Sequence, residues 1–219
     1  GAGWAEYRFG AGRDQPRLVA ITLGTGIGGA LVFDGRLDRG VNGMAGEFGH
    51  MIIRPGGHRC ECGNRGCWEQ YASGNALGRE ARELAVSGSP VGADLLARAG
   101  GDPGRIVGSL VTEAARDGDP AAVELFHEVG HWLGVGLANI SAALDPSMFV
   151  IGGGVSDAGD LLLSSARESL ARNLTGRGFR PVPDVLVAEQ GPLANVIGMA
   201  DLARLAVRDH DRAGAVGGA

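Results

Sequence analysis

The sequence predicts an α/β fold in which short buried strands alternate with amphipathic helices. Apolar runs of strand length recur along the chain, at residues 18–23, 30–33, 148–151 and 185–188. Two of these runs lead directly into glycine clusters, which is typical of tight turns at strand ends. Between the runs lie longer segments whose apolar residues recur at helical spacing and whose starts carry capping residues. No internal repeat is visible, so this alternation sets the fold class.

The first part of the chain is expected to hold a short helix followed by a hairpin. Residues 1–12 predict a helix that glycines end, and its start without a capping signal suggests a piece of a longer chain. Strand 18–23 leads through glycines into strand 30–33. Asp34-Gly35 is then a strong hairpin signal toward a short strand at Arg36-Leu37.

Two capped helices are expected in the middle of the chain. Ser73 or Asn75 can cap a helix that runs to about Val86. The segment 87–104 is rich in glycine, proline and aspartate, and predicts a surface excursion around a short helix at Leu95-Leu96. Asp119-Pro120 starts a long helix that Pro146 ends, with aspartate as the cap and proline in the first turn. Glycines within that helix favour close packing against the sheet.

The last part of the chain predicts a strand, a helix, a strand and a helix. Strand 148–151 ends in glycines, and Asp157 is expected to open an amphipathic helix that runs to about Leu174. A strand at 185–188 and a helix at about 194–207 complete the fold. The tail from Asp209 is small and polar, and we expect it to be flexible.

All three cysteines of the chain, Cys60, Cys62 and Cys67, lie in one short stretch. Together with a nearby histidine they form the soft four-ligand set that zinc takes in a closed structural site. Glycines within the stretch allow the turn that brings the thiols together. An odd cysteine count also fits poorly with a set of disulfides. Spacing alone does not decide whether His50 or His58 is the fourth ligand.

Composition narrows the classes of function. The net charge of −5 and the pI of about 5.5 argue against a nucleic-acid surface, which is normally basic. All 20 basic residues are arginine, which excludes a P-loop lysine and a Schiff-base lysine from this chain. No apolar run approaches the length of a membrane span. Thiols committed to a metal suit a cytoplasmic location.

Two glycine clusters favour a nucleotide phosphate. The first is Gly24-Thr25-Gly26-Ile27-Gly28-Gly29, whose backbone N–H groups and threonine hydroxyl can cradle phosphate. It lacks the lysine of a P-loop and precedes a strand, which rules out a dinucleotide fingerprint; a tight β-hairpin is the alternative. The second, Gly152-Gly153-Gly154, lies between a strand and a helix, where backbone can approach a nucleotide. A plain strand-to-helix turn is the alternative there.

Glu47, His50 and Glu69 form a further constellation around the cysteines. A metal site would fix Glu69 near His50, because Glu69 follows the last cysteine closely. Two carboxylates and an imidazole make a polar wall that suits sugar hydroxyls, which both donate and accept hydrogen bonds. The alternative is a pair of solvated surface glutamates.

These motifs resemble the signature of the ROK family of sugar kinases and sugar-responsive repressors. Glu47-Phe48-Gly49-His50 and the segment from Cys60 to Glu69 carry the resemblance, and the glycine clusters at 24–29 and 152–154 match in order and spacing. The resemblance runs from Trp4 to about Leu205. Trp4 to Gly12 and Cys67 to Gly74 are most similar to the glucokinase members from high-GC (actinobacterial) bacteria.

The resemblance implies an actin-like ATPase (ribonuclease H-like) domain with a zinc-binding loop at residues 50–69. It also implies phosphorylation of glucose with ATP and Mg²⁺. Glu47 and Glu69 would bind sugar hydroxyls, and His50 would ligate zinc through one nitrogen and contact the sugar through the other. Residues 24–29 would take the ATP phosphates, and Gly153 with Gly154 the nucleoside.

The chain departs from the family pattern at its start. ROK kinases carry an N-terminal ATPase motif and an Asn-Asp pair whose aspartate is the general base, and this chain holds neither. We therefore expect the base upstream of Gly1, and no phosphoryl transfer by these 219 residues alone. Residues 1–14 would be a helix carried over from the missing domain, 15–208 the C-terminal ATPase domain and 209–219 a flexible tail.

The alternatives stay within the family. A sugar-responsive transcriptional repressor is the second candidate, although the intact glycine cluster at 24–29 favours a kinase. A kinase for mannose, fructose or an N-acetylhexosamine is the third. The expected partners are a hexose and ATP, with no nucleic acid and no membrane, and the resemblance implies a homodimer or homotetramer.

Overall fold

The computed structural model describes residues 1–216, and a mixed five-stranded sheet lies at its centre. The sheet has the order β3-β2-β1-β4-β5, in which β1, β2 and β3 pair antiparallel and β1, β4 and β5 pair parallel. The strands are β1 (Arg17–Leu23), β2 (Ile27–Phe33), β3 (Arg36–Asp38), β4 (Met148–Gly152) and β5 (Asp184–Val187). The prediction of an α/β fold is confirmed.

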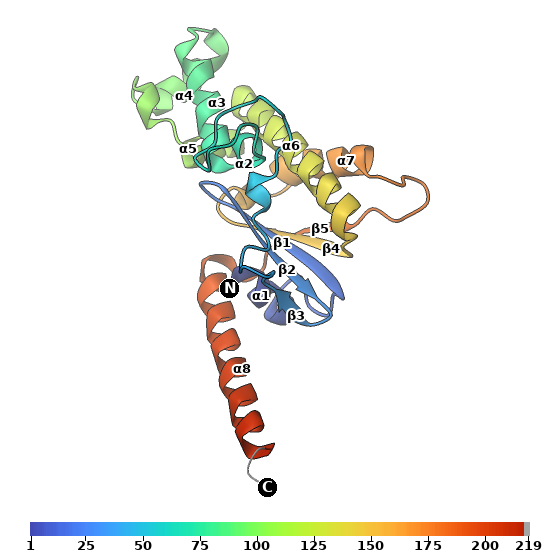
Figure 1. The fold of residues 1–219 in the computed structure, drawn as a ribbon. Coiled ribbons are helices and arrows are strands. Elements are labelled where there is room, and N and C mark those ends of the chain that lie inside the picture. The colour runs from blue at the N-terminus through green and yellow to red at the C-terminus, as the bar shows by residue number, and fades with distance from the viewer. Residues whose placement is uncertain (217–219) are drawn as a thin grey trace.

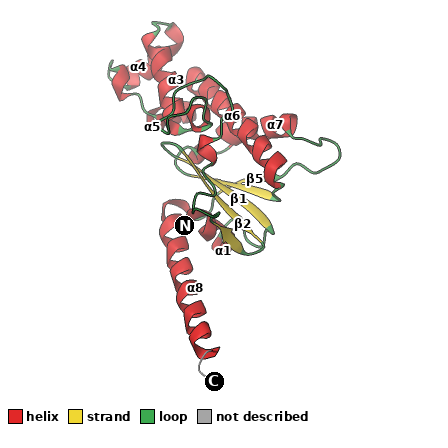
Figure 2. Cartoon of the chain, viewed as in Figure 1, coloured by secondary structure: helices red, strands yellow, loops and turns green. Residues whose placement is uncertain are grey.

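Helices cover both faces of this sheet (Figure 1). They are α1 (Ala2–Phe9), α2 (Glu69–Ala72), α3 (Gly74–Val86), α4 (Ala93–Arg98), α5 (Gly108–Arg116), α6 (Pro120–Leu144), α7 (Asp160–Asn173) and α8 (Ala194–Val216). The predicted caps form, because the side chains of Ser73 and Asp119 accept hydrogen bonds from the N–H groups of Ala76 and Ala122. Figure 2 shows α6 and α7 beside the small sheet, α3 to α5 beyond α6, and α8 projecting from the opposite side of the molecule.

The strand residues alternate between two cores. On β4, Phe149 and Ile151 face the large core under α6 and α7, whereas Met148 and Val150 face a smaller core with Trp4 of α1. A strand that is apolar on both faces must be covered on both faces. That requirement explains why β1 and β4 are continuous apolar runs rather than alternating ones.

The glycines of α6 serve a helix pair rather than the sheet. A Cβ atom at Gly130 would lie 2.5 Å from the carbonyl oxygen of Leu162, and one at Gly134 would lie 2.3 Å from that of Ala166. Both carbonyls belong to α7, so the two helices approach backbone to backbone. The prediction that these glycines pack against the sheet is therefore wrong. Periodicity shows which face of a helix carries small residues, but not which element packs on that face.

Other boundaries differ from the sequence prediction. Helix α5 was not expected, and the supposed surface excursion at 87–104 packs into the large core through fully buried Leu95. A 3-10 turn at Ser156–Ala158 precedes α7, so that helix starts at Asp160 rather than at Asp157.

Helix α8 continues to Val216, past the end predicted near residue 207. Residues 217–219 of the expected flexible tail lie outside the described residues. Within residues 1–216, no helix combines the length and the apolar character that crossing a membrane requires.

A buried carboxylate joins α1 to α8. Asp201, which is only 5% exposed, accepts hydrogen bonds from the indole N–H of Trp4 at 2.9 Å and from the guanidinium of Arg8 at 3.2 Å. Arg204 donates to its other oxygen at 2.7 Å. The hydrogen bond from Arg204 is the main cause that lowers the pKa of the Asp201 carboxyl, and the bond from Trp4 adds to it. The carboxylate thereby holds α1 against the first half of α8 on the small core.

We expect Asp201→Asn to destabilise the chain at neutral pH, by about 1–3 kcal/mol for the weakened charged hydrogen bonds. A carboxyl whose pKa is lowered in the folded state stabilises above its unfolded pKa, near 3.8, and loses that contribution as the pH falls through its folded pKa. The difference between the two proteins in free energy of unfolding should therefore shrink below about pH 4. Urea denaturation between pH 7 and 3 measures it. Asp184→Asn, at an exposed position of β5, is the control, and an equal effect there would contradict the prediction.

Candidate functional site

The segment from His50 to Glu69 is a loop held by its own backbone. Ile52 and Cys67 form one antiparallel bridge, and Arg59 and Arg65 form another. Gly66 closes the loop with φ +83°, and a Cβ atom there would lie 1.8 Å from the carbonyl oxygen of Arg54. Only glycine fits this position, because it combines a left-handed conformation with a close backbone approach.

The loop brings one histidine and all three cysteines to a single point. His50 Nδ1 lies 3.6 Å from Cys60 Sγ, and Cys62 Sγ lies 3.6 Å from Cys67 Sγ. All four ligand atoms lie within 4.8 Å of one another. A tetrahedral zinc with bonds of about 2.3 Å separates its ligand atoms by about 3.7 Å, so these side chains fit such an ion with little movement.

The structure distinguishes the two candidate histidines. The ring of His58 packs on Tyr71, with ring centroids 5.3 Å apart, and its Nε2 lies 4.0 Å from a carboxylate oxygen of Glu80. His58 is therefore turned toward α3 and away from the thiols. His50 is the histidine of the cluster.

The thiols differ in their affinity for protons. Burial first, and then the hydrogen bond to Glu69, raise the pKa of the Cys60 thiol to about 12. Burial also raises the pKa of Cys67, whereas the backbone N–H of Asn64 lowers that of exposed Cys62. A cation that binds here must displace protons from two buried thiols, so its uptake releases protons.

The three residues predicted to form a polar wall do come together. His50 Nε2 lies 3.9 Å from a carboxylate oxygen of Glu47, and His50 Nδ1 lies 3.5 Å from Oε1 of Glu69. Glu69 is 16% exposed and Glu47 is 57% exposed, so the wall runs from the buried cluster to solvent. The imidazole thus faces Cys60 and Glu69 with Nδ1 and Glu47 with Nε2.

The first glycine cluster is a β-hairpin. Leu23 of β1 pairs with Ile27 of β2, which leaves Gly24, Thr25 and Gly26 as the turn and places Gly28 and Gly29 inside β2. The glycine-rich turn expected over residues 24–29 is therefore shorter than predicted, and the tight β-hairpin given as the alternative is what forms. These glycines allow close packing instead: a Cβ atom at Gly29 would lie 2.4 Å from the Phe48 ring.

The two glycine clusters are neighbours at one edge of the sheet. β1 and β4 are parallel and adjacent, with Thr22 opposite Gly152, so both clusters follow the carboxyl ends of their strands. Gly153 has φ +91°, and a Cβ atom there would lie 2.4 Å from the carbonyl oxygen of Leu23. Ligands of α/β sheets bind at this edge of the sheet.

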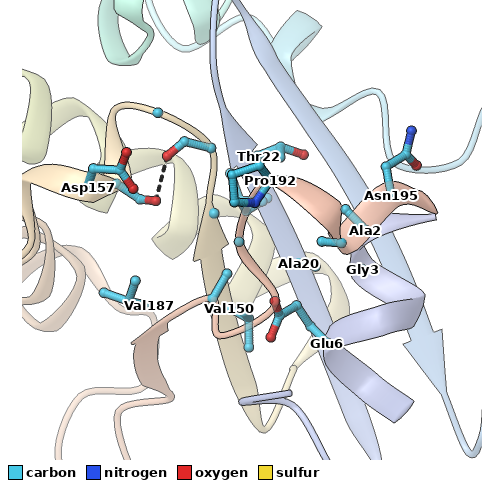
Figure 3. Close-up of a pocket in the computed structure, with 18 residues that line it drawn as sticks. Ala2, Gly3, Glu6, Ala20, Thr22, Val150, Asp157, Val187, Pro192 and Asn195 are labelled. Atoms are coloured by element: carbon cyan, nitrogen blue, oxygen red, sulfur yellow. Dashed lines mark hydrogen bonds between the residues drawn. The ribbon is translucent and has the colours of Figure 1, made fainter. Parts of the chain in front are cut away.

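A cavity of about 340 Å³ lies beside the second cluster (Figure 3). The sheet contributes Thr22 and Val150, and helix α1 contributes Gly3 and Glu6. Gly152, Gly153 and Gly154 also line it, together with Asp157 and Asn195 at the starts of the following segments. The described lining does not include residues 24–29, which form the neighbouring hairpin.

Sequence analysis missed Glu6, which shapes this cavity. Glu6 is buried and accepts hydrogen bonds from the backbone N–H groups of Ala11, Glu189 and Gln190 at 3.1, 3.1 and 2.7 Å. It thereby ties α1 to the turn that leads into α8. The only sequence signal was an acidic residue on the buried side of a short helix, next to Trp4 and Ala5.

Comparisons with known proteins agree with this arrangement. A sequence model described as the ROK family matches residues 1–206. The chain belongs to the ROK family. The glucokinase of Streptomyces coelicolor is 48% identical over 93% of this chain and 64% of its own length. The family resemblance and its actinobacterial character are thereby confirmed.

Solved structures of ROK proteins share the fold. A ROK family glucokinase from Streptomyces griseus, in complex with glucose and AMPPNP, is 48% identical, with a TM-score of 0.87 over 93% of this chain and 65% of that one. A ROK family transcriptional regulator, homologous to the E. coli MLC protein, is 29% identical, with a TM-score of 0.77 over 90% of this chain and 48% of that one. The present chain spans less than two thirds of the length of these ROK relatives.

Proposed function

We propose that this chain is part of an ATP-dependent ROK glucokinase that phosphorylates glucose to glucose 6-phosphate. The observation that carries the proposal is that the polar wall of Glu47, His50 and Glu69 lies directly against the glycine hairpin at 24–26. Oε2 of Glu69 lies within 3.5 Å of the Ile27 nitrogen at the end of that hairpin. A hexose on the wall would therefore sit beside a phosphate held by the hairpin. The likeness to Streptomyces glucokinases supports glucose as the sugar.

In this proposal the wall binds sugar hydroxyls. Glu47 and Glu69 accept hydrogen bonds, and His50 Nε2 donates one, because a neutral imidazole that ligates zinc through Nδ1 carries its proton on Nε2. Glu69 is partly buried, so its hydrogen bonds to a sugar would be stronger than those of an exposed carboxylate, because little water competes there. We propose no general base among the residues of this chain, which matches only part of the length of the glucokinase relatives.

The nucleotide would bind at the sheet edge that both glycine clusters share. Gly24, Thr25 and Gly26, the turn of the hairpin, would face the phosphates, and Gly153 with Gly154 the nucleoside. The carboxylate of Asp157 lines the adjacent cavity. A phosphate near a carboxylate is stabilised when a divalent cation neutralises both, which supports Mg²⁺ as the partner of ATP.

A structural zinc would be held by His50, Cys60, Cys62 and Cys67. The ion would supply a rigid cross-link that orients the His50 ring and holds Glu69 near it. Ligands of this kind need thiols that are not oxidised, which favours a cytoplasmic protein.

The proposed division into domains is separate from the zinc site. Residues 15–208 would form an actin-like ATPase domain, and residues 1–14 would be a helix that belongs to the preceding domain.

Two alternatives remain distinct proposals. A sugar-responsive repressor is favoured by one observation, the likeness to a ROK transcriptional regulator over most of this chain. A kinase for mannose, fructose or an N-acetylhexosamine would use the same wall. A homodimer or homotetramer is the proposed assembly in every case.

We expect Glu69→Gln to reduce kcat/KM for glucose by about 10–100-fold, because a neutral amide replaces a charged acceptor at roughly 1.5–3 kcal/mol. The assay uses this chain joined to the N-terminal domain of the Streptomyces coelicolor glucokinase, with ATP turnover coupled to product formation. A repressor domain would show sugar binding without turnover.

Glu61→Gln is the matched control. Glu61 lies on the same loop and is exposed, and a surface substitution usually changes free energies by about 0.5 kcal/mol or less. Equal glucose kinetics in Glu69→Gln and Glu61→Gln would remove Glu69 from the sugar site. A joined protein that turns over mannose or an N-acetylhexosamine but not glucose would favour the third alternative.

A further inference from the structure

Gly26 and Glu69 are in direct contact, although sequence analysis assigns them to different substrates. A Cβ atom at Gly26 would lie 2.4 Å from Oε2 of Glu69. No Cβ atom fits at that distance, so any other residue at position 26 must displace the carboxylate. The neighbouring Ile27 N–H also points at the same oxygen, at 3.5 Å.

The opposite oxygen of Glu69 is confined as well. Oε1 accepts a hydrogen bond from Cys60 Sγ at 3.0 Å and lies 3.5 Å from His50 Nδ1. The carboxylate is therefore wedged between the hairpin and the ligand cluster. Glutamate ends are flexible in general, but this one can move only by losing contact on one side or the other.

The same hairpin is braced by backbone from the segment that carries the wall. A Cβ atom at Gly49, in the turn Phe48–His50, would lie 2.4 Å from the carbonyl oxygen of Ile27. The N–H of Gly74, after Glu69 along the chain, donates to the carbonyl of Gly24 at 2.8 Å. The Glu69 contact is therefore one of several that hold the hairpin against the segment of residues 48–74, and it reaches the turn itself through a side chain.

We propose that Gly26 is a positioning residue for Glu69, so that the phosphate hairpin and the sugar wall with its metal cluster are coupled through this carboxylate. The inference rests on the proposed function. It adds that the phosphate site and the sugar site depend on each other, which neither site implies alone. A change in the hairpin at Gly26 should weaken the metal and sugar side, and a change at Glu69 should loosen the hairpin. Coupling of this kind acts equally in both directions.

The first test measures metal affinity in the 219-residue chain by competition with a chelator, using Zn²⁺ and, for its visible spectrum, Co²⁺. Gly26→Ala should raise the Kd for the metal by about 10-fold, because the added methyl pushes the negative Glu69 carboxylate toward thiols that bind the metal as thiolates, and like charges repel. Gly24→Ala is the matched control in the same turn, because a Cβ atom at Gly24 meets nothing within 4 Å. Its metal affinity and Co²⁺ spectrum should equal those of the wild type.

A double-mutant cycle shows whether Glu69 carries the effect. In a Glu69→Ala background, Gly26→Ala should cause no further loss of metal affinity, because the displaced group is already absent. An additional 10-fold loss in that background would overturn the proposal. So would equal metal affinities for Gly26→Ala and Gly24→Ala in the chain that retains Glu69.

The second test needs no metal. Amide hydrogen exchange in the metal-free chain should be several-fold faster at Ile27 in Glu69→Ala, which removes the acceptor, and near wild type in Glu69→Gln, which retains a carbonyl oxygen. Unchanged exchange in Glu69→Ala would overturn the proposal. A wild-type chain that binds no metal would contradict the zinc assignment under the proposed function, while this exchange measurement would still decide the coupling.

Discussion

Cys67→Ser is expected to remove the metal from the protein. The wild-type chain should contain about one zinc, as a single four-ligand site implies, and the variant close to none. Cys67 is fully buried, and its sulfur lies 3.6 Å from that of Cys62, so a serine oxygen cannot replace it as a soft ligand there. Structural zinc ions contribute about 10–16 kcal/mol of binding free energy in small zinc domains, so the loss should be large at this loop.

Metal analysis and hydrogen exchange check this prediction together. Faster exchange should be confined to residues 50–69 and their contacts, because two buried cores hold the rest of the chain. His58→Ala is the control, since His58 packs on Tyr71 outside the cluster and its loss should leave the zinc in place. A wild-type chain that is folded, metal-free and has three freely titrating thiols would refute the site.

The sequence predicted the ligand chemistry but not the choice of histidine. Three thiols and two glycines lie within one short stretch, so their pattern can be recognised in the sequence without knowing the fold. His50 and His58 are both close in sequence to the cysteines. What separates them is the contact of His58 with Tyr71 and Glu80, which depends on how α2 and α3 pack against the loop.

The relation between the two proposed substrate sites could not be predicted from the sequence either. Gly26 and Glu69 are far apart along the chain, and their contact follows from the register of β1 with β2 and from where the metal loop crosses the hairpin. Glu6 could not be predicted for the same reason, because its hydrogen-bond donors are backbone N–H groups of the distant residues 189 and 190. Each strand and most helices were predictable, since apolar periodicity and caps are local.

Trp68 links the loop of residues 50–69 to the large core. It lies between Cys67 and Glu69, it is fully buried, and its indole N–H donates to the carbonyl oxygen of Trp132 on α6 at 2.8 Å. A Cβ atom at Gly136, one turn further along α6, would lie 2.0 Å from the indole ring. The indole therefore rests directly on the glycine backbone of α6. The contact of Trp68 with α6 therefore fixes where the neighbouring residues Cys67 and Glu69 lie.

We expect Trp68→Ala to destabilise the protein by about 3–5 kcal/mol, the usual cost of a cavity left by a large buried aromatic side chain. Zinc affinity should fall as well, because the contact with α6 that holds Cys67 and Glu69 in place is lost. Urea denaturation and metal competition measure the two effects. Trp4→Ala, in the smaller core on the other face of the sheet, is the control that should destabilise the chain without lowering zinc affinity.

Gly136→Ala tests the same contact from the helix side. In the wild type it should cost about 1–3 kcal/mol, because the added methyl overlaps the indole and forces a shift. In a Trp68→Phe background the smaller ring leaves space for that methyl, so Gly136→Ala should cost clearly less there, with an interaction energy of about 0.5–3 kcal/mol between the two substitutions. Strictly additive costs would mean that the helix yields rather than the indole, and that Trp68 does not set the position of the metal loop on α6.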